Sequence, residues 1–194
     1  MMDWITSNWI ELTGVNLAFL YLILEVRRKW PMWIVGIFSS AFYVYIFYNV
    51  HLFANMGLNV FYTLMSFYGL YCWKFSKTNK EEDTINFHFI SKHLAVRLGI
   101  LFVVLFAFIY WILTLFPESE VPIPDALIAA LSIVATWMTA RKIVECWYLW
   151  ISANYLGFGL YMFQGLFLTS ILYLVYANIS IFGFMSWRKF VLKR

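Results

Sequence analysis

The chain has few charged residues: Lys, Arg, Asp and Glu make up 12% of its 194 positions, about half the share that is usual in a soluble domain. Hydrophobic residues reach 63% and aromatic residues 22%. A soluble domain of this length must keep most of its residues in contact with water, so it could not cover that much apolar surface. Disorder is excluded as well, because disordered chains are polar and poor in aromatic residues. The composition therefore predicts a protein embedded in a lipid bilayer.

Motifs of enzyme and metal chemistry are also missing. The chain has only 2 Cys and 3 His, and none of them has the spacing of a metal site. A nucleotide-binding P-loop, an HExxH zinc motif and a GxSxG nucleophile motif are absent. The basic residues fall between apolar runs and form no soluble basic face, which argues against a nucleic-acid partner. We therefore expect no catalytic residues, no bound metal and no cofactor.

Apolar runs predict seven transmembrane helices, because a helix needs roughly 20 residues to cross about 30 Å of hydrocarbon. Lipid requires every backbone polar group to be bonded within its own segment, which favours helices over strands. The runs cover residues 9–26, 32–49, 54–73, 94–116, 125–140, 143–163 and 166–187. The one long polar stretch, residues 74–93, is a connector too short to form a domain.

All 14 Lys and Arg residues fall on one side of the membrane if the N-terminus lies outside. They occupy the loop after the first run, the connector and the adjoining start of the fourth run, the loop after the fifth run, and the tail. Cytoplasmic loops of membrane proteins carry the excess of Lys and Arg. The pattern predicts a multi-pass protein with its N-terminus outside and its C-terminus in the cytoplasm. Cys72 and Cys146 then lie on the reducing side, so we expect no disulfide.

A gap-free internal repeat is the strongest pattern in the sequence. Shifting the chain by 114 residues aligns pairs of identical residues: Trp33 with Trp147, Ser66 with Ser180, Gly69 with Gly183, and Trp73 with Trp187. Matches of this kind extend through three apolar runs. Repeats of long period indicate a duplicated architectural unit.

The repeat sets the expected domain organisation. The expected parts of the chain are a first three-helix repeat (9–73), a cytoplasmic connector (74–93), a linker helix (94–116), a second three-helix repeat (125–187) and a basic cytoplasmic tail (188–194). The predicted fold class is therefore an all-α integral membrane protein with a 3+1+3 arrangement. Four runs separate the starts of the two copies, so both copies cross the membrane in the same direction. Parallel repeats are typical of transporters; a duplicated structural or adaptor protein is the alternative.

Aromatic and amide side chains recur at helical spacing within the runs. Buried polar groups are costly in lipid unless they are paired or line a cavity, so these residues are candidates for substrate binding. They lie in the sixth run (Trp147, Trp150 and Asn154, with Gln164 at its end), in the seventh run (Tyr173, Tyr176 and Ser180) and at equivalent positions of the third run (Asn59, Tyr62 and Ser66). Two facing stripes would form a cavity with stacking walls, which suits a flat, polar, cationic ring. A sugar or another aromatic heterocycle would also fit, and a single Tyr or Ser could instead serve helix packing.

The middle of the runs contains no Asp, Glu, His or Lys. Proton-coupled carriers usually place an ionisable group at this depth. We therefore predict facilitated diffusion by alternating access, without energy coupling. Glu145 lies beside Arg141 and Lys142 at the cytoplasmic end of the sixth run, where it could form a gate contact or a structural ion pair.

Several motifs resemble those of the PnuC family of vitamin transporters. They are Arg141-Lys142, the spacing Glu145-x-Trp147-x-x-Trp150-x-x-x-Asn154, Gln164-Gly165 and, later, Gly183 and Trp187. The first repeat echoes them with Tyr68-Gly69, Tyr71 and Trp73. The resemblance extends from about Trp9 to Trp187.

The resemblance implies a fold related to the sugar-transporting SWEET proteins and uptake of nicotinamide riboside across the bacterial inner membrane. It also implies a homotrimer, and a cytoplasmic kinase that acts on the product of transport. The implied substrate contacts are Trp147, Trp150, Asn154 and Gln164, with Tyr173 and Tyr176 as walls. Some members have an Asn-Gly pair where this chain has Phe182-Gly183, so thiamine is an alternative substrate. Other relatives carry riboflavin, and a SWEET-like sugar uniporter is a more distant alternative.

Overall fold

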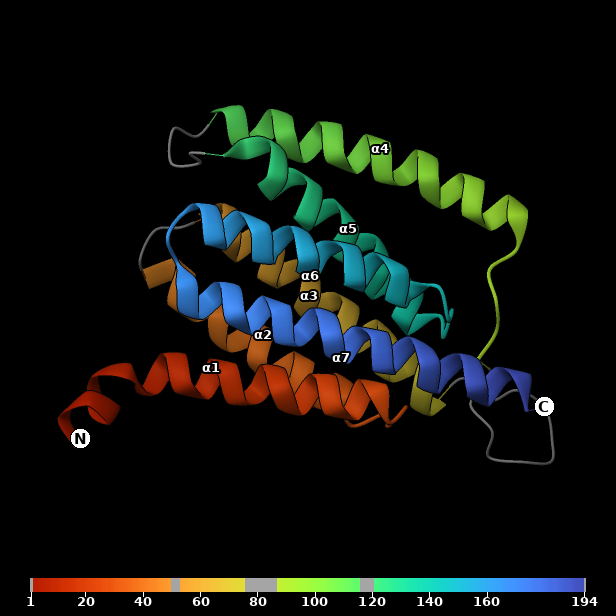
Figure 1. The fold of residues 1–194 in the computed structure, drawn as a ribbon, viewed down its shortest axis with the longest axis horizontal. Coiled ribbons are helices and arrows are strands. Elements are labelled where there is room, and N and C mark those ends of the chain that lie inside the picture. The colour runs from red at the N-terminus through yellow and green to blue at the C-terminus, as the bar shows by residue number, and fades with distance from the viewer. Residues whose placement is uncertain (1, 50–52, 76–86, 116–120, 194) are drawn as a thin grey trace. The chain divides into compact units, whose positions relative to one another are not determined.

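The fold is all-helical. The structure is a computed structural model that describes residues 2–49, 53–75, 87–115 and 121–193. Those residues form seven α-helices, one π-helical turn and no strand (Figure 1). The elements are α1 (Met2–Val26), α2 (Met32–Asn49), α3 (Phe53–Leu70), the π-helical turn η1 (Tyr71–Phe75), α4 (Lys92–Leu115), α5 (Pro122–Ala140), α6 (Cys146–Phe163) and α7 (Phe167–Leu192). Each α-helix falls on one of the seven predicted apolar runs, so the all-α prediction is confirmed.

The ends of the helices depart from the apolar runs at three places. Helix α1 begins at Met2 rather than at residue 9, and α7 continues through Leu192 into the basic tail. Helix α5 begins at Pro122, ahead of the run expected to start at residue 125. Proline is tolerated in the first turn of a helix, because its missing N–H would have no partner there. Residues 76–86 of the predicted connector lie outside the described residues.

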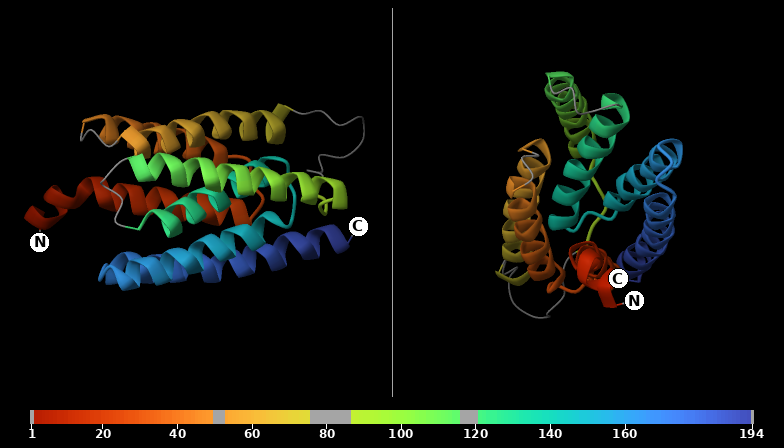
Figure 2. Two further views of the ribbon diagram at one scale, coloured as in Figure 1. Left: turned by 90° about the horizontal axis from the view of Figure 1, so that it is seen from above. Right: turned by 90° about the vertical axis from the view of Figure 1, so that its left-hand side faces the viewer.

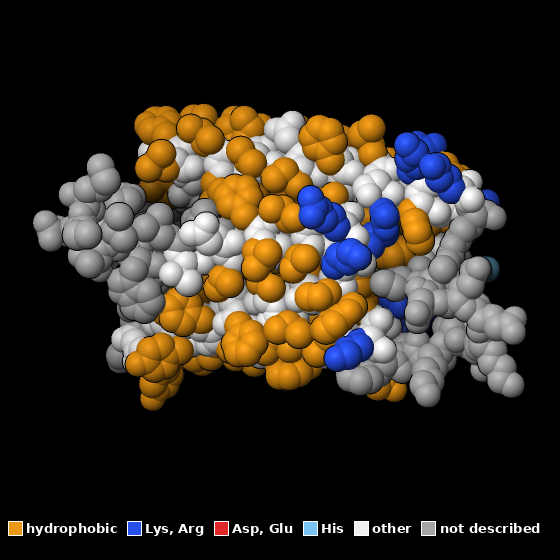
Figure 3. Space-filling model, turned by 90° about the horizontal axis from the view of Figure 1, so that it is seen from below, with side chains coloured by type: hydrophobic (Ala, Val, Ile, Leu, Met, Phe, Trp, Pro, Cys, Tyr) orange, Lys and Arg blue, Asp and Glu red, His pale blue; other side chains and the backbone are white. Residues whose placement is uncertain are grey.

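Four of the described helices, α2, α4, α5 and α7, are long and apolar enough to cross a membrane. Among them α4 is the least covered by protein, since Leu98 is its only buried residue. Hydrophobic side chains also cover much of the surface drawn in Figure 3, with Lys and Arg gathered in part of it. Apolar surface of this extent is compatible with lipid rather than with water.

The chain divides into two compact units, Met1–Asp83 and Thr84–Arg194. In the first unit α2 packs against both α1 and α3, and in the second α6 packs against both α5 and α7. The paired helices α2 and α3 lie side by side, as do α6 and α7 (Figure 2). The linker helix expected at 94–116 is α4; it belongs to the second unit and packs on α5. The 3+1+3 arrangement of the two repeats stays a prediction.

The sequence repeat reappears in the hydrogen bonds of two loops. At the end of α1 and at the end of α5, the chain leaves the helix through the two backbone bonds of a Schellman motif. The bonds run from Arg28 N to Glu25 O (2.9 Å), from Lys29 N to Leu24 O (2.9 Å), from Lys142 N to Thr139 O (3.0 Å) and from Ile143 N to Met138 O (3.0 Å). Each donor and each acceptor of the first loop corresponds to the residue 114 positions later in the second loop.

These two loops hold a basic residue in the left-handed region of backbone conformation. The φ angles are 56° at Arg28 and 63° at Lys142. The loop between α6 and α7 has a third motif of this kind, in which Gly165 takes the same place with φ 75°. For a residue with a Cβ this conformation is less stable by about 1–2 kcal/mol, whereas glycine adopts it freely.

Relieving this strain in one loop and creating it in another gives a matched pair of stability predictions. Lys142→Gly is expected to raise the free energy of unfolding by up to about 1 kcal/mol, and Gly165→Ala is expected to lower it by a similar amount. These values allow for the unfolded chain, which gains conformational freedom from the added glycine and loses it when glycine is replaced. Thermal unfolding of both variants in detergent measures the two shifts. Shifts of the same sign would contradict the left-handed conformations.

Each unit contains the same cluster of two tryptophans and one glycine, which we call the tryptophan box. The second unit builds it from Trp147 on α6 with Gly183 and Trp187 on α7, and the first unit from Trp33 on α2 with Gly69 on α3 and Trp73 in η1. The two indole rings meet edge to face, with centroids 5.3 Å apart in the second unit and 6.0 Å apart in the first. All four tryptophans are buried.

A glycine in each box lets an indole ring contact the backbone of the neighbouring helix. A Cβ added at Gly183 would overlap the ring of Trp147, and one at Gly69 would overlap the ring of Trp33. The helices of each pair therefore approach closely at the box, as small residues allow in membrane proteins. The boxes fix α2 against α3 and α6 against α7.

Candidate substrate site

Helix α6 presents Trp150 as a half-buried ring that is held in place from α5. The indole Nε1–H donates a hydrogen bond to Oγ1 of Thr139, at 3.3 Å. Thr139 itself is fully buried. Because the polar edge of the ring is bonded to α5, the orientation of the indole plane is set before any ligand arrives. A preset aromatic face suits the stacking of a flat ring.

One turn further along α6, Asn154 joins α6 to α7. Its Nδ2 donates to Oγ of Ser180 at 3.3 Å, and that hydroxyl donates to the carbonyl of Tyr176 at 2.8 Å. Among the described residues the Asn154 side chain makes no other hydrogen bond. An amide has two N–H donors and a carbonyl oxygen with two lone pairs, so most of its bonding capacity is unused. Asn154 is therefore a half-buried polar group of α6 with capacity to bind a ligand.

Tyrosine rings extend this surface along α7. The ring of Tyr173 lies against α6 at Gly157, where an added Cβ would overlap it. Its centroid is 4.9 Å from that of Tyr161 and 6.1 Å from that of Tyr176. The structure thus brings together the predicted residues Asn154, Tyr173, Tyr176 and Ser180 within the α6–α7 pair.

Three predicted residues of the second unit lie apart from this group. Trp147 is fully buried in the tryptophan box, and its Nε1–H has no hydrogen-bond partner among the described residues. Gln164 is exposed at the other end of α6, in the loop before α7. The Glu145 carboxylate accepts a hydrogen bond from the backbone N–H of Ile90, at 3.0 Å.

In the first unit, the predicted residues Asn59, Tyr62 and Ser66 lie on α3. The Thr63 hydroxyl is 2.8 Å from Oγ of Ser40 on α2 and 2.9 Å from the carbonyl oxygen of Asn59. Ser66 is buried close to Gly36, and the ring of Tyr62 lies 5.7 Å from that of Phe61.

Sequence reasoning missed Thr139, Ser40 and Thr63. Hydroxyl groups within apolar runs look like helix-packing groups, so composition alone gives them no weight. The repeat does carry a signal for one of them, since Ser40 is the counterpart of Asn154 at the offset of 114 residues. Ser40 bonds Thr63 and so joins α2 to α3, as Asn154 bonds Ser180 and joins α6 to α7.

The two units differ at the residues that form the Trp150–Thr139 hydrogen bond. At the counterparts of Trp150 and Thr139 the first unit has Gly36 and Glu25. Glu25 is a buried carboxylate, only 2% exposed, in the last turn of α1. Nowhere in the described ranges do three or more His, Cys, Asp or Glu side chains gather closely enough to hold a metal ion.

The sequence profile of the family described as "Nicotinamide mononucleotide transporter" matches residues 8–189. The chain belongs to this family. The resemblance to PnuC-type vitamin transporters is thereby confirmed, and this member of the nicotinamide mononucleotide transporter family is a multi-pass membrane protein.

Individual relatives within the family differ in the vitamin they are named for. The chain is 27% identical to the nicotinamide riboside transporter PnuC of Escherichia coli (strain K12) over 203 residues, which covers 93% of this chain and 85% of the relative. It is 25% identical to the riboflavin/roseoflavin transporter RibM of Streptomyces davaonensis over 202 residues, 96% of this chain and 92% of that one. Relatives named as transporters of two different vitamins support a vitamin transporter of the same kind.

A solved structure shares the fold. The crystal structure of the vitamin B3 transporter PnuC matches with a TM-score of 0.73 and 22% sequence identity, over 96% of this chain and 83% of that one. The match shows that this chain has the same fold as that transporter.

Proposed function

We propose that the chain is a carrier that takes up nicotinamide riboside by facilitated diffusion. The observation that carries the proposal is Asn154, a half-buried amide on an apolar helix with most of its hydrogen-bonding capacity unused. An amide group in lipid needs a partner, and the carboxamide and ribose hydroxyls of nicotinamide riboside are partners of the right chemistry. The ring of Trp150 lies one turn away, and aromatic faces attract a cationic pyridinium ring.

Uncoupled transport follows from the chemistry of the same residues. Trp150, Asn154, Tyr173, Tyr176 and Ser180 contain no group that ionises near neutral pH. A carrier of this kind alternates between two open states and moves its substrate down the substrate's own gradient. We further propose a bacterial inner-membrane location with the N-terminus outside, a homotrimeric assembly, and a cytoplasmic kinase that traps the substrate. In the first unit Asn59, Tyr62 and Ser66 remain candidates.

Riboflavin is the rival substrate with the most direct support, because RibM matches almost the whole chain. Its isoalloxazine ring is neutral and larger than a pyridinium ring. Thiamine, which also has a cationic aromatic ring, is the alternative raised by Phe182 in place of an amide. Calorimetry on the purified protein with all three vitamins side by side separates them. Binding of nicotinamide riboside alone is the expected result, and binding of riboflavin or thiamine alone would overturn the proposed substrate.

The uncoupled mechanism has its own test in liposomes that contain only this protein. Nicotinamide riboside is expected to enter down its gradient at the same rate with and without proton or sodium gradients. A requirement for either ion gradient would contradict facilitated diffusion.

Replacing Asn154 tests the residue on which the proposal depends. Asn154→Ala is expected to weaken nicotinamide riboside binding by about 1–3 kcal/mol, because a hydrogen bond to the substrate is lost. Asn178→Ala is the matched control, since Asn178 is an exposed amide on α7 whose Nδ2 bonds the carbonyl of Leu174 in its own helix, at 2.7 Å. Equal affinity of both variants would remove Asn154 from the site.

A further inference from the structure

A short extended segment, Phe87–Ile90, is bonded to the loop between α5 and α6; we call it the strap. The His88 N–H donates to the carbonyl of Lys142 at 3.2 Å, and the Val144 N–H donates to the carbonyl of His88 at 3.1 Å. His88 and Ile143 thereby form a parallel bridge. The strap thus adds one short extended pairing to a unit that is otherwise helical.

The strap is also anchored on α7 by an aromatic contact. Phe87 is buried, and its ring centroid lies 4.5 Å from that of Trp187 and 5.7 Å from that of Phe190. Trp187 belongs to the tryptophan box that fixes α6 against α7. The strap therefore touches the start of α6 and the end of α7 at the same time.

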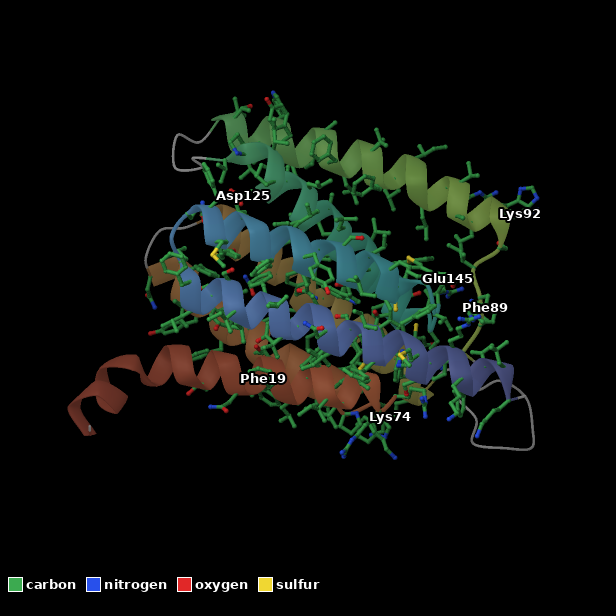
Figure 4. The ribbon with its side chains drawn as sticks, viewed as in Figure 1. Phe19, Lys74, Phe89, Lys92, Asp125 and Glu145 are labelled. Carbon is green, nitrogen blue, oxygen red and sulfur yellow. The ribbon has the colours of Figure 1, made fainter. Side chains whose placement is uncertain are left out.

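The Glu145 side chain adds a further contact between the strap and the start of α6. The residue occupies the N-cap position of α6 but does not cap that helix with its carboxylate. Its Oε2 instead accepts the N–H of Ile90 at 3.0 Å, directly before Ser91, whose backbone carbonyl and hydroxyl accept bonds from the first turn of α4. Figure 4 shows Glu145, Phe89 and Lys92 at the end of this unit opposite Asp125.

The first unit has no carboxylate at the position that corresponds to Glu145. The counterpart of Glu145 at the offset of 114 residues is Pro31, which has no carboxylate. The two loops share their Schellman bonds, so the Glu145 contact is a difference between two loops of otherwise equivalent backbone bonding. A contact confined to the unit that carries Trp150 and Asn154 points to a role connected with them.

We propose that Glu145 is a positioning residue that acts through the strap. By binding Ile90 it holds the first turn of α6 in place, so that Trp150 keeps its bond to Thr139 and Asn154 keeps its bond to Ser180. Glu145 itself does not touch the substrate. The link to substrate affinity rests on the proposed function, whereas the link between the carboxylate and the strap does not. A direct charge gate for a cationic substrate is the competing role of the same residue.

Two substitutions separate the roles. Glu145→Gln keeps a carbonyl oxygen that can accept the Ile90 N–H but removes the charge, and Glu145→Ala removes both. His93→Ala, an exposed position at the start of α4, is the control. Hydrogen exchange of the full-length protein in detergent, without substrate, is followed on peptides that cover Phe87–Ser91 and Cys146–Trp150. Binding of nicotinamide riboside is measured on the same samples.

Glu145→Ala is expected to speed exchange at Ile90 and in the first turn of α6 by about ten-fold, as loss of a charge-assisted hydrogen bond predicts. Its affinity for nicotinamide riboside is expected to fall several-fold, and Glu145→Gln is expected to restore most of both properties. Unchanged exchange in Glu145→Ala would overturn the proposal, as would equal loss of affinity in both variants. The expected exchange pattern in a protein that binds no nicotinamide riboside would support the strap contact and count against the proposed substrate instead.

Discussion

Trp150→Ala is expected to weaken nicotinamide riboside binding by about 1–3 kcal/mol, the value of stacking a base-like ring on an aromatic side chain. That loss corresponds to a rise in Kd of about 5- to 150-fold. The ring is half-buried, and its Nε1–H is bonded to Thr139 at 3.3 Å, so the stacking face is held in a fixed orientation. Calorimetric titration of the purified variant measures the change.

Two comparisons show whether the ring face itself is responsible. Trp150→Phe keeps an aromatic face without the anchoring N–H, so its affinity is expected to fall between those of wild type and Trp150→Ala. Trp111→Ala removes an indole that is 57% exposed on α4 and is expected to leave binding unchanged. If the Trp111 and Trp150 variants lost the same affinity, the effect would come from the membrane environment and not from stacking.

Gly183→Ala is expected to lower the free energy of unfolding by about 1–3 kcal/mol, the usual cost of forcing extra atoms into a packed interior. The added Cβ would overlap the Trp147 ring. That ring cannot turn aside easily, because it is fully buried and meets Trp187 edge to face. Thermal unfolding in detergent, followed by near-ultraviolet circular dichroism, measures the loss.

Gly159→Ala is the control for this clash, because it makes the same change within α6 where nothing lies within 4 Å of the new Cβ. It is expected to gain about 0.5–1 kcal/mol from helix propensity. Trp147→Phe combined with Gly183→Ala is expected to recover part of the lost stability, since the smaller ring leaves room. A Gly183 variant as stable as the Gly159 variant would contradict the close approach of α6 and α7.

Apolar runs were sufficient to predict where the helices lie. The run at 32–49 coincides with α2, because a strongly apolar segment in lipid has no alternative to helix. The ends were harder to predict, since helix α1 begins at Met2 among polar residues that hydropathy cannot assign. Helix α5 begins at Pro122, ahead of the apolar run 125–140, because proline suits the first turn of a helix but does not extend an apolar run.

Helical periodicity predicted which candidate residues share a face but not how deeply each is buried. Trp147, Trp150 and Asn154 do fall at helical spacing on α6, yet Trp147 is fully buried. Its burial depends on Gly183, a residue of another helix, which leaves room for the ring. Spacing within one helix contains no information about that partner.

The strap could not be predicted, for a different reason. The stretch 74–93 is polar overall and predicts a simple connector, although apolar residues, among them Phe87, Phe89 and Ile90, gather toward its end. The bonds that hold the strap are mostly backbone bonds to the loop after α5. Backbone pairing leaves almost no trace in side-chain composition.

Internal duplication, which the sequence repeat predicts, would make the two units copies that are alike at some places and differ at others. The left-handed loop residues Arg28 and Lys142 and the glycines Gly69 and Gly183 are equivalent. Divergence falls at Gly36 against Trp150 and at Ser40 against Asn154. Only the second unit therefore carries the Trp150 and Asn154 side chains, while both units share the loop conformation and the box glycines. A chain built from two such units could acquire a new substrate preference through changes in the second unit, without a matching change in the first.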